Sequence, residues 1–157
     1  LTREMDTVAV ELAAAPGPAG CHSMGNPHAV VFVDDVEEVD LERIGPAMEH
    51  DDLFPERVNL SIVHQQEEGL FRVRVWERGA GITLACGSGA CAVGVAIARR
   101  GLGGRKNGIM MDGGLITIDW QDDGSVGGRV VMTGPVAYAF HGAMEGAVEQ
   151  VLEASNG

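Results

Sequence analysis

No charged residue occurs between Arg78 and Arg99, and residues 90–98 within this stretch are apolar at every position. A helix that is hydrophobic on every side is buried on every side, so this segment predicts a helix of about residues 87–100 at the centre of a protein core. Its small side chains would let strands pack closely around it. Arg99 and Arg100 followed by Gly101 are typical of a helix C-terminus, where cations and a glycine are favoured.

A membrane-spanning helix is the alternative explanation of an uncharged stretch this long. Five glycines interrupt residues 79–98, and Thr83 and Ser88 are polar. The continuous helical part is therefore shorter than the roughly 20 apolar residues that a span requires. We expect no membrane partner.

Segments with the composition of strands lie on both sides of the expected helix. They cover residues 6–13, 29–33, 59–64, 70–76, 109–111, 115–120, 125–132 and 137–140. A second, amphipathic helix is expected over residues 40–49, with Asp40 as its N-cap. Many strands and one buried helix predict an α+β fold in which a mixed, curved, barrel-like sheet wraps around the central helix.

We expect one domain over residues 1–142 and a tail over residues 143–157 that ends in a frayed helix. The chain begins with Leu1 instead of Met. This start suggests a processed product or a fragment of a longer protein. The three cysteines form neither a Cys-x-x-Cys pair nor an even disulfide framework, which is typical of the reducing cytoplasm.

The formal net charge of −12 argues against nucleic acids and anionic membranes as partners, because both attract basic surfaces. Acidic residues are concentrated between Asp34 and Glu56. We interpret this concentration as a solvated helix with its flanking loops, not as a metal site. A zinc site built from Cys21, His22 and His28 matches no structural zinc spacing, so no metal is expected.

Cys86 stands where a glycine-rich turn is expected to lead into the central helix. The first N–H groups of a helix lack internal partners and carry partial positive charge, so they favour a thiolate and can bind a substrate carboxylate. Gly87 and Gly89 would let a ligand approach the backbone closely. The alternative is that Cys86 is a small buried hydrophobic residue, as we expect of Cys91 inside the helix.

Two further groups of polar residues are candidates for ligand binding. Arg78 suits a carboxylate and Glu77 an ammonium group, which together are what an amino acid requires, although a surface ion pair is the alternative. Asn26 lies in a turn before Pro27, and His28 could tune a neighbouring thiol, although a plain turn would explain both. Asn59 could equally be the cap of a strand.

Six motifs occur in an order and spacing that resemble the C-terminal half of diaminopimelate epimerase, from about residue 24 to residue 140. They are Met-Gly-Asn-Pro-His at 24–28, Phe-Pro at 54–55 with Asn59, Glu-Arg-Gly at 77–79, Ala-Cys-Gly-Ser-Gly-Ala at 85–90, Gly-Gly at 113–114 and Thr-Gly-Pro at 133–135. Ser88 stands where the family commonly has Thr, and Ile82 where many members have Glu. The Cys-Gly-Ser/Thr-Gly motif also occurs in proline racemases.

The resemblance implies a role for each of these candidates. Cys86 would be the catalytic acid–base residue, and His28 and Glu77 would tune the pKa values of the thiols. The substrate contacts would be Asn26, Asn59, Glu77, Arg78, Gly87 and Ser88. The family uses neither pyridoxal phosphate nor a metal, so no cofactor is expected. Its fold consists of two similar halves, each a barrel-like sheet around a helix, with the substrate between them.

Inversion at an α-carbon requires a base on one face and an acid on the other, and each half of the resembled enzyme supplies one cysteine. The chain is therefore expected to be the C-terminal half of a two-cysteine epimerase that interconverts LL- and meso-diaminopimelate. Its partners would be the amino-acid substrate, the missing N-terminal half and possible homodimer copies, and it should be inactive without that half. The alternatives are a proline-type racemase domain and a non-catalytic amino-acid-binding domain.

Overall fold

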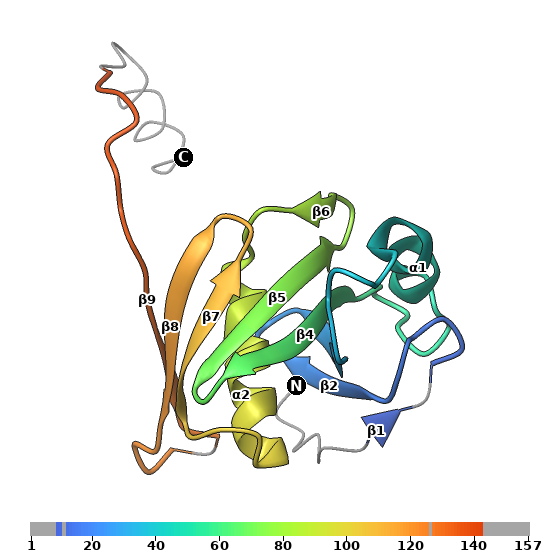
Figure 1. The fold of residues 1–157 in the computed structure, drawn as a ribbon, viewed down its shortest axis with the longest axis horizontal. Coiled ribbons are helices and arrows are strands. Elements are labelled where there is room, and N and C mark those ends of the chain that lie inside the picture. Colours follow the sequence, from blue (N-terminus) through green and yellow to red (C-terminus); the bar gives the residue numbers. More distant parts are fainter. Residues whose placement is uncertain (1–8, 11, 126, 143–157) are drawn as a thin grey trace, which may run out of the picture.

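The computed structural model describes residues 9–10, 12–125 and 127–142, which form nine strands and two helices (Figure 1). In chain order these are β1 (Ala9–Val10), β2 (Ala19–Ser23), β3 (Pro27–Phe32), α1 (Leu41–Glu49), β4 (Asn59–Glu67), β5 (Leu70–Glu77), β6 (Gly81–Thr83), α2 (Gly87–Arg100), β7 (Lys106–Met111), β8 (Gly114–Gln121) and β9 (Arg129–Thr133). None of the helices in this part of the chain is long and apolar enough to cross a membrane.

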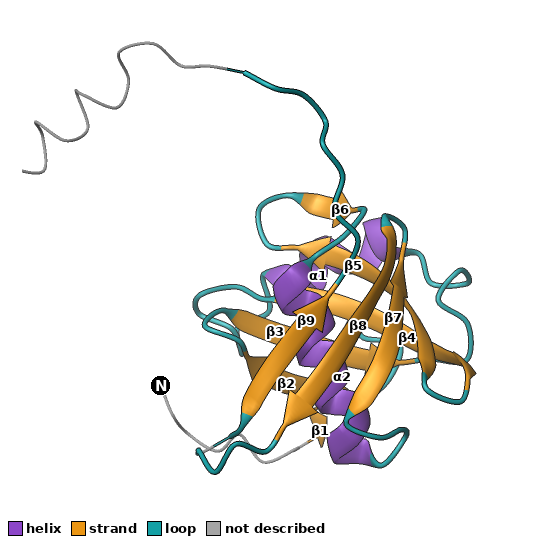
Figure 2. Ribbon diagram, turned by 90° about the vertical axis from the view of Figure 1, so that its left-hand side faces the viewer, coloured by secondary structure: helices purple, strands orange, loops and turns teal. Residues whose placement is uncertain are grey.

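All nine strands belong to one mixed sheet in the order β1-β2-β3-β4-β5-β7-β8-β9, and β6 pairs with β5 at one end. The pairs β3–β4 and β5–β7 are parallel, and the remaining pairs are antiparallel. The sheet curls around α2 (Figure 2). The α+β fold with a curved, mixed sheet is therefore confirmed.

Helix α2 packs against β2, β3, β4, β7, β8 and β9, and most of its residues are buried. Small residues allow this close approach. A Cβ atom at Gly94 would lie 2.4 Å from Cγ2 of Ile118 on β8, well inside van der Waals contact. The helix ends as the sequence indicates, with Gly101 in the left-handed conformation at φ 68°.

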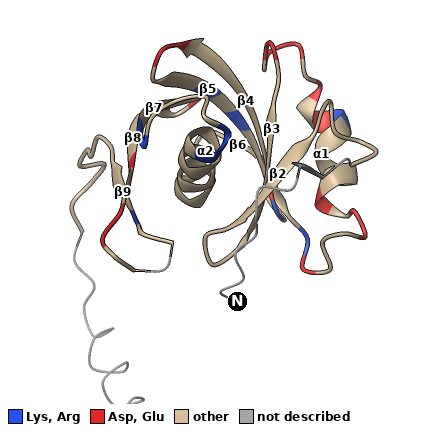
Figure 3. Cartoon of the chain, turned by 90° about the horizontal axis from the view of Figure 1, so that it is seen from below, with Lys and Arg blue, Asp and Glu red and all other residues tan. Residues whose placement is uncertain are grey.

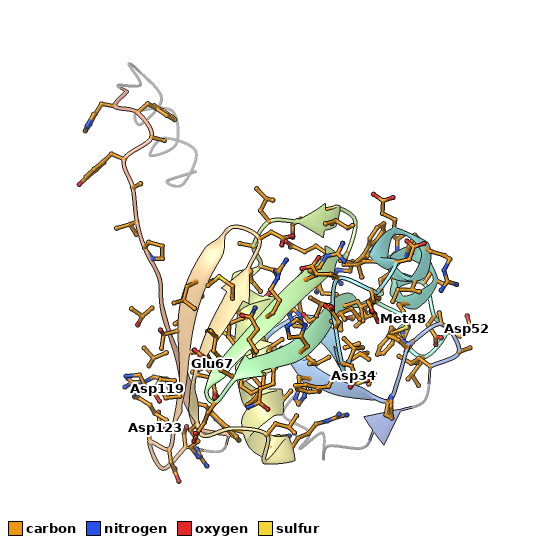
Figure 4. The ribbon with its side chains drawn as sticks, in the orientation of Figure 1. Asp34, Met48, Asp52, Glu67, Asp119 and Asp123 are labelled. Atoms are coloured by element: carbon orange, nitrogen blue, oxygen red, sulfur yellow. The ribbon has the colours of Figure 1, made fainter. Side chains whose placement is uncertain are left out.

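Helix α1 covers the opposite face of β3 and β4 (Figure 3). Its residues Leu41, Ile44 and Met48 are buried in a second apolar cluster, and Met48 points from the helix toward the sheet (Figure 4). The Asp40 side chain accepts a hydrogen bond from the Arg43 N–H, as expected of an N-cap. Strands β3 and β4 are thus buried on both faces, which fixes the position of the loops at their ends.

One strand was predicted wrongly and two were missed. Residues 137–140 form no strand, and Val136, Tyr138 and Phe140 are 97%, 92% and 85% exposed. Alternation of apolar and small residues indicates a strand only where a neighbouring strand is available, and in the described residues none lies beside this segment (Figure 1). Strands β2 and β6 were missed because prolines and glycines surround them. The expected tail over residues 143–157 lies outside the described residues.

Candidate active site

Cys86 is the N-cap residue of α2, in an extended conformation with φ −141° and ψ 108°. Its Sγ accepts a hydrogen bond from the Gly89 N–H at 3.4 Å and lies 3.6 Å from the Ser88 hydroxyl. The thiol is 7% exposed. The sulfur therefore occupies the position of a helix-capping oxygen, directed at the amides of the first turn.

Burial raises the pKa of the Cys86 thiol above its ordinary value, and the neighbouring Glu77 carboxylate raises it further. The Gly89 N–H and the Ser88 hydroxyl lower it, in the direction expected for a helix N-terminus. The sequence indicated that the helix N-terminus lowers the pKa of Cys86, but it did not indicate that burial raises this pKa by more. In this chain the protonated thiol is the resting form.

Glu77, the last residue of β5, is held beside the thiol by the β5–β6 hairpin. The Thr83 hydroxyl donates to Glu77 Oε1 at 2.5 Å. Val75 pairs with Thr83, and Glu77 pairs with Gly81, so Thr83 and Glu77 are diagonal neighbours across the hairpin. Thr83 was not among the candidates, although the glycines of the turn and the period-two alternation of the strands could have identified it.

A chain of hydrogen bonds connects His28 to the thiol. His28 Nε2 lies 3.0 Å from Asn26 Oδ1, and Asn26 Nδ2 donates to the Ser88 hydroxyl at 3.4 Å. Burial lowers the pKa of His28 to about 4, so the ring is neutral at pH 7. Because an amide oxygen only accepts, neutral His28 carries its proton on Nε2. Neutral His28 is therefore connected to Cys86 through Asn26 and Ser88 by hydrogen-bond contacts and not by a charge.

Asn59 links the two loops that carry the remaining candidates. Its Nδ2 donates to the Pro27 carbonyl at 2.9 Å, and its Oδ1 accepts from the Arg78 N–H at 3.0 Å. Arg78 is exposed, and one guanidinium nitrogen donates to the Glu56 carbonyl at 2.7 Å. Asn59 thus holds the backbone of Arg78 close to the start of β3.

Exposed apolar side chains occur in β6, just after it, and in β9. Ile82 is 37%, Leu84 is 70% and Met132 is 51% exposed, and we call these three residues the apolar rim. Met132 comes within 3.4 Å of a Cβ atom placed at Gly87. A rim of this kind is typical of a surface that another protein surface covers.

The zinc alternative receives no support from the described residues. Among residues 12–125 and 127–142, no group of three or more His, Cys, Asp or Glu side chains could hold a metal ion. His22 and His28 face each other across β2 and β3, but the pKa of His22 is lowered to about 4, mainly by burial. Neither ring has a third ligand beside it.

Comparisons with known proteins identify relatives of this arrangement. A family model described as diaminopimelate epimerase matches residues 20–139. The chain is 51% identical to the diaminopimelate epimerase of Acidiphilium cryptum over 150 residues and 54% identical to that of Rhodospirillum centenum over 140 residues. These alignments cover 94% and 88% of this chain but 52% and 47% of the relatives. The chain thus spans about half the length of the curated relatives it matches.

A phenazine biosynthesis protein of the PhzF family from Bacillus anthracis has a similar fold. The two structures align with a TM-score of 0.50 over 73% of this chain and 37% of that protein, at 21% identity. This likeness concerns the fold alone.

Proposed function

This chain belongs to the diaminopimelate epimerase family, and we propose that it is the C-terminal half of an enzyme that interconverts LL- and meso-diaminopimelate. The observation that carries the proposal is the position of Cys86, whose sulfur lies at the N-terminus of α2 beside the Ser88 hydroxyl. A matching N-terminal half would supply the second cysteine. The length of the relatives, about twice that of this chain, is consistent with such a half.

The first turn of α2 is suited to bind the substrate α-carboxylate. By helix geometry the N–H groups of Gly87 and Ser88 have no partner within the helix, and both lie next to the thiol. An anion bound there is stabilised by the helix dipole. The same donors would stabilise the negative charge that develops when the α-proton leaves, which replaces the electron sink that a cofactor provides elsewhere.

Inversion then requires one proton to leave one face of the α-carbon and another proton to arrive at the opposite face. Cys86 rests as a thiol, because burial and Glu77 raise its pKa. It would donate its proton to the carbanion while the cysteine of the other half, as thiolate, removes the α-proton. After turnover the protonation states of the two sulfurs are exchanged, and the reverse reaction uses them in the opposite roles.

The apolar rim supports a second half that closes over this site. Ile82 belongs to β6, Leu84 follows it and Met132 belongs to β9. The segment after β9 runs away from the sheet (Figure 2), and its side chains Val136, Tyr138 and Phe140 are exposed as well. Covering them would exclude water from the thiol and strengthen its polar contacts. With one half alone, the site would stay open to water and only one acid–base group would be present.

The proposal is tested by comparing this chain alone with the same chain joined to the N-terminal half of the Acidiphilium cryptum relative. Both are incubated with LL-diaminopimelate in D₂O, and inversion is followed by a stereochemical assay. We expect inversion from the joined protein and none from the chain alone. Proline is the control substrate, since a proline-type racemase would act on it. Inversion of diaminopimelate by the unjoined chain would contradict the two-cysteine mechanism. Inversion of proline but not of diaminopimelate by the joined protein would contradict the proposed substrate.

A further inference from the structure

Glu49, at the end of α1, is a buried carboxylate in a region where acidic side chains are otherwise mostly exposed. The residue is 4% exposed, while its neighbours Asp51 and Asp52 are half-buried and exposed. A buried charge is costly unless hydrogen bonds and charged partners compensate it. The position of Glu49 therefore indicates a specific role.

Three donors meet at this carboxylate, two from the end of β5 with its following turn and one from the loop before β4. The Trp76 indole Nε1 donates to Oε2 at 2.8 Å, and the Gly79 N–H donates to Oε1 at 3.0 Å. Arg57 Nη1 approaches Oε1 at 3.4 Å. The Trp76 hydrogen bond lowers the pKa of Glu49, and the Gly79 N–H reinforces it against the opposing effect of burial, so the carboxylate is charged at neutral pH.

Trp76 and Gly79 flank Glu77 and Arg78, two of the residues that the family resemblance implies as substrate contacts. The backbone of this turn is held from both sides, because the Arg78 N–H is bonded to Asn59 and the Gly79 N–H to Glu49. Two consecutive amides of an exposed turn are thus bonded to buried side chains of other elements. The backbone of this turn, and hence the point from which each of its side chains starts, is thereby fixed.

Packing between α1 and Trp76 reinforces this arrangement. A Cβ atom at Gly45 would lie 2.2 Å from Cδ2 of Trp76, so only glycine allows the indole to lie against the helix. The indole is thereby directed at Glu49, one helical turn further along. Helix α1 and the turn at residues 77–79 therefore contact each other through the Trp76 indole and the Glu49 carboxylate.

We propose that Glu49 is a positioning residue that fixes the turn at residues 77–79 and thereby aims Arg78 and Glu77 at the substrate. The consequence for the substrate rests on the proposed function, whereas the fixing of the turn does not. No pattern in the sequence indicated Glu49, because it lies within the acidic segment assigned to solvent.

The fixing of the turn is tested in the chain itself by amide hydrogen exchange, measured by NMR on Glu49→Gln. Glutamine keeps one acceptor oxygen but loses the charge that strengthens both hydrogen bonds. We therefore expect Gly79 to exchange about tenfold faster, the difference between a charged and a neutral acceptor. Glu42→Gln, an exposed glutamate of the same helix, should leave Gly79 unchanged. If Glu49→Gln fails to fold, Trp76→Phe removes the indole N–H that holds the Glu49 carboxylate and should accelerate Gly79 exchange by a smaller factor. Unchanged exchange at Gly79 in the variant that folds would overturn the proposal.

The consequence for the substrate is tested in the joined protein by steady-state kinetics. We expect Glu49→Gln to raise KM for diaminopimelate several-fold more than it lowers kcat, since Arg78 binds the substrate before and during reaction. A merely structural role would lower the amount of active enzyme and leave KM unchanged, which would overturn the positioning of the substrate groups. An inactive parent protein would instead refute the proposed function, while the exchange measurement still decides the fixing of the turn.

Discussion

Lowering the pH from 7 to 5 should destabilise this domain through two buried histidines. His22 and His28 are 4% and 1% exposed, and their pKa values are lowered to about 4 from an ordinary 6.5, mainly by burial. Between these values the unfolded chain binds more protons than the folded chain, so stability falls as the pH falls. The stability is fully present above about pH 6.5 and is lost as the pH falls toward 4.

The size of the effect follows from the shift. Each histidine whose pKa is lowered by two to three units contributes about 2 kcal/mol between pH 7 and pH 5, and the pair about 3–4 kcal/mol. This is a large share of the 5–15 kcal/mol that is typical of a domain. Arg99 and Arg100 near His22 and Arg78 near His28 act in the same direction, while Glu77 opposes the shift at His28.

Urea unfolding at a series of pH values measures this effect directly. We expect the free energy of unfolding to fall by about 3–4 kcal/mol between pH 7 and pH 5 with the denaturant slope unchanged. His22→Asn should remove about half of the dependence, whereas His50→Gln, at an exposed position, should leave it intact. A free energy that stays constant over this range, or a dependence that persists fully in His22→Asn, would refute the reasoning.

Two further substitutions test the core and the thiol. Gly94→Ala should lower the free energy of unfolding by about 1–3 kcal/mol or more, because the added methyl group forces Ile118 aside. Gly104→Ala is the control and should cost little, because the space around Gly104 is open. Urea unfolding compares the two variants, and equal stabilities would refute the close packing of α2. Ser88→Ala should raise the pKa of Cys86 still further, because the hydroxyl lowers it, so the pH profile of site-resolved alkylation should move to higher pH; an unmoved profile would exclude the Ser88 contact.

Local sequence patterns were sufficient to predict the central helix and its burial, but not to predict every strand of the sheet around it. The apolar character of α2, its arginines and its terminal glycine all lie within one continuous segment, so the burial of the helix followed from that segment alone. The segment at residues 137–140 shows the opposite case. Its alternation of apolar and small residues indicates that one side should be covered but does not indicate which element covers it. Within the described residues nothing covers it.

The sequence predicted which residues meet at the candidate site better than it predicted their protonation states and contacts. Asn26, His28, Ser88 and Cys86 do meet, in one chain of hydrogen bonds. That His28 is neutral, however, follows from its burial between β2 and β4, which depends on long-range strand pairing. Glu49 was missed for the same reason. Its charge suggested solvent, and only the packing of α1 against β5 and its turn reveals its partners.

The central claim is that Cys86 is the acid–base group of this half, and one measurement tests it most directly. Cys86→Ser and Cys91→Ser are each introduced into the chain joined to the Acidiphilium cryptum half, and inversion of LL-diaminopimelate in D₂O is measured. We expect Cys86→Ser to fold and to lose inversion by at least about 100-fold, the contribution of a positioned acid or base. Cys91→Ser, which changes a half-buried thiol within α2, should retain it. Undiminished inversion in Cys86→Ser would contradict the account.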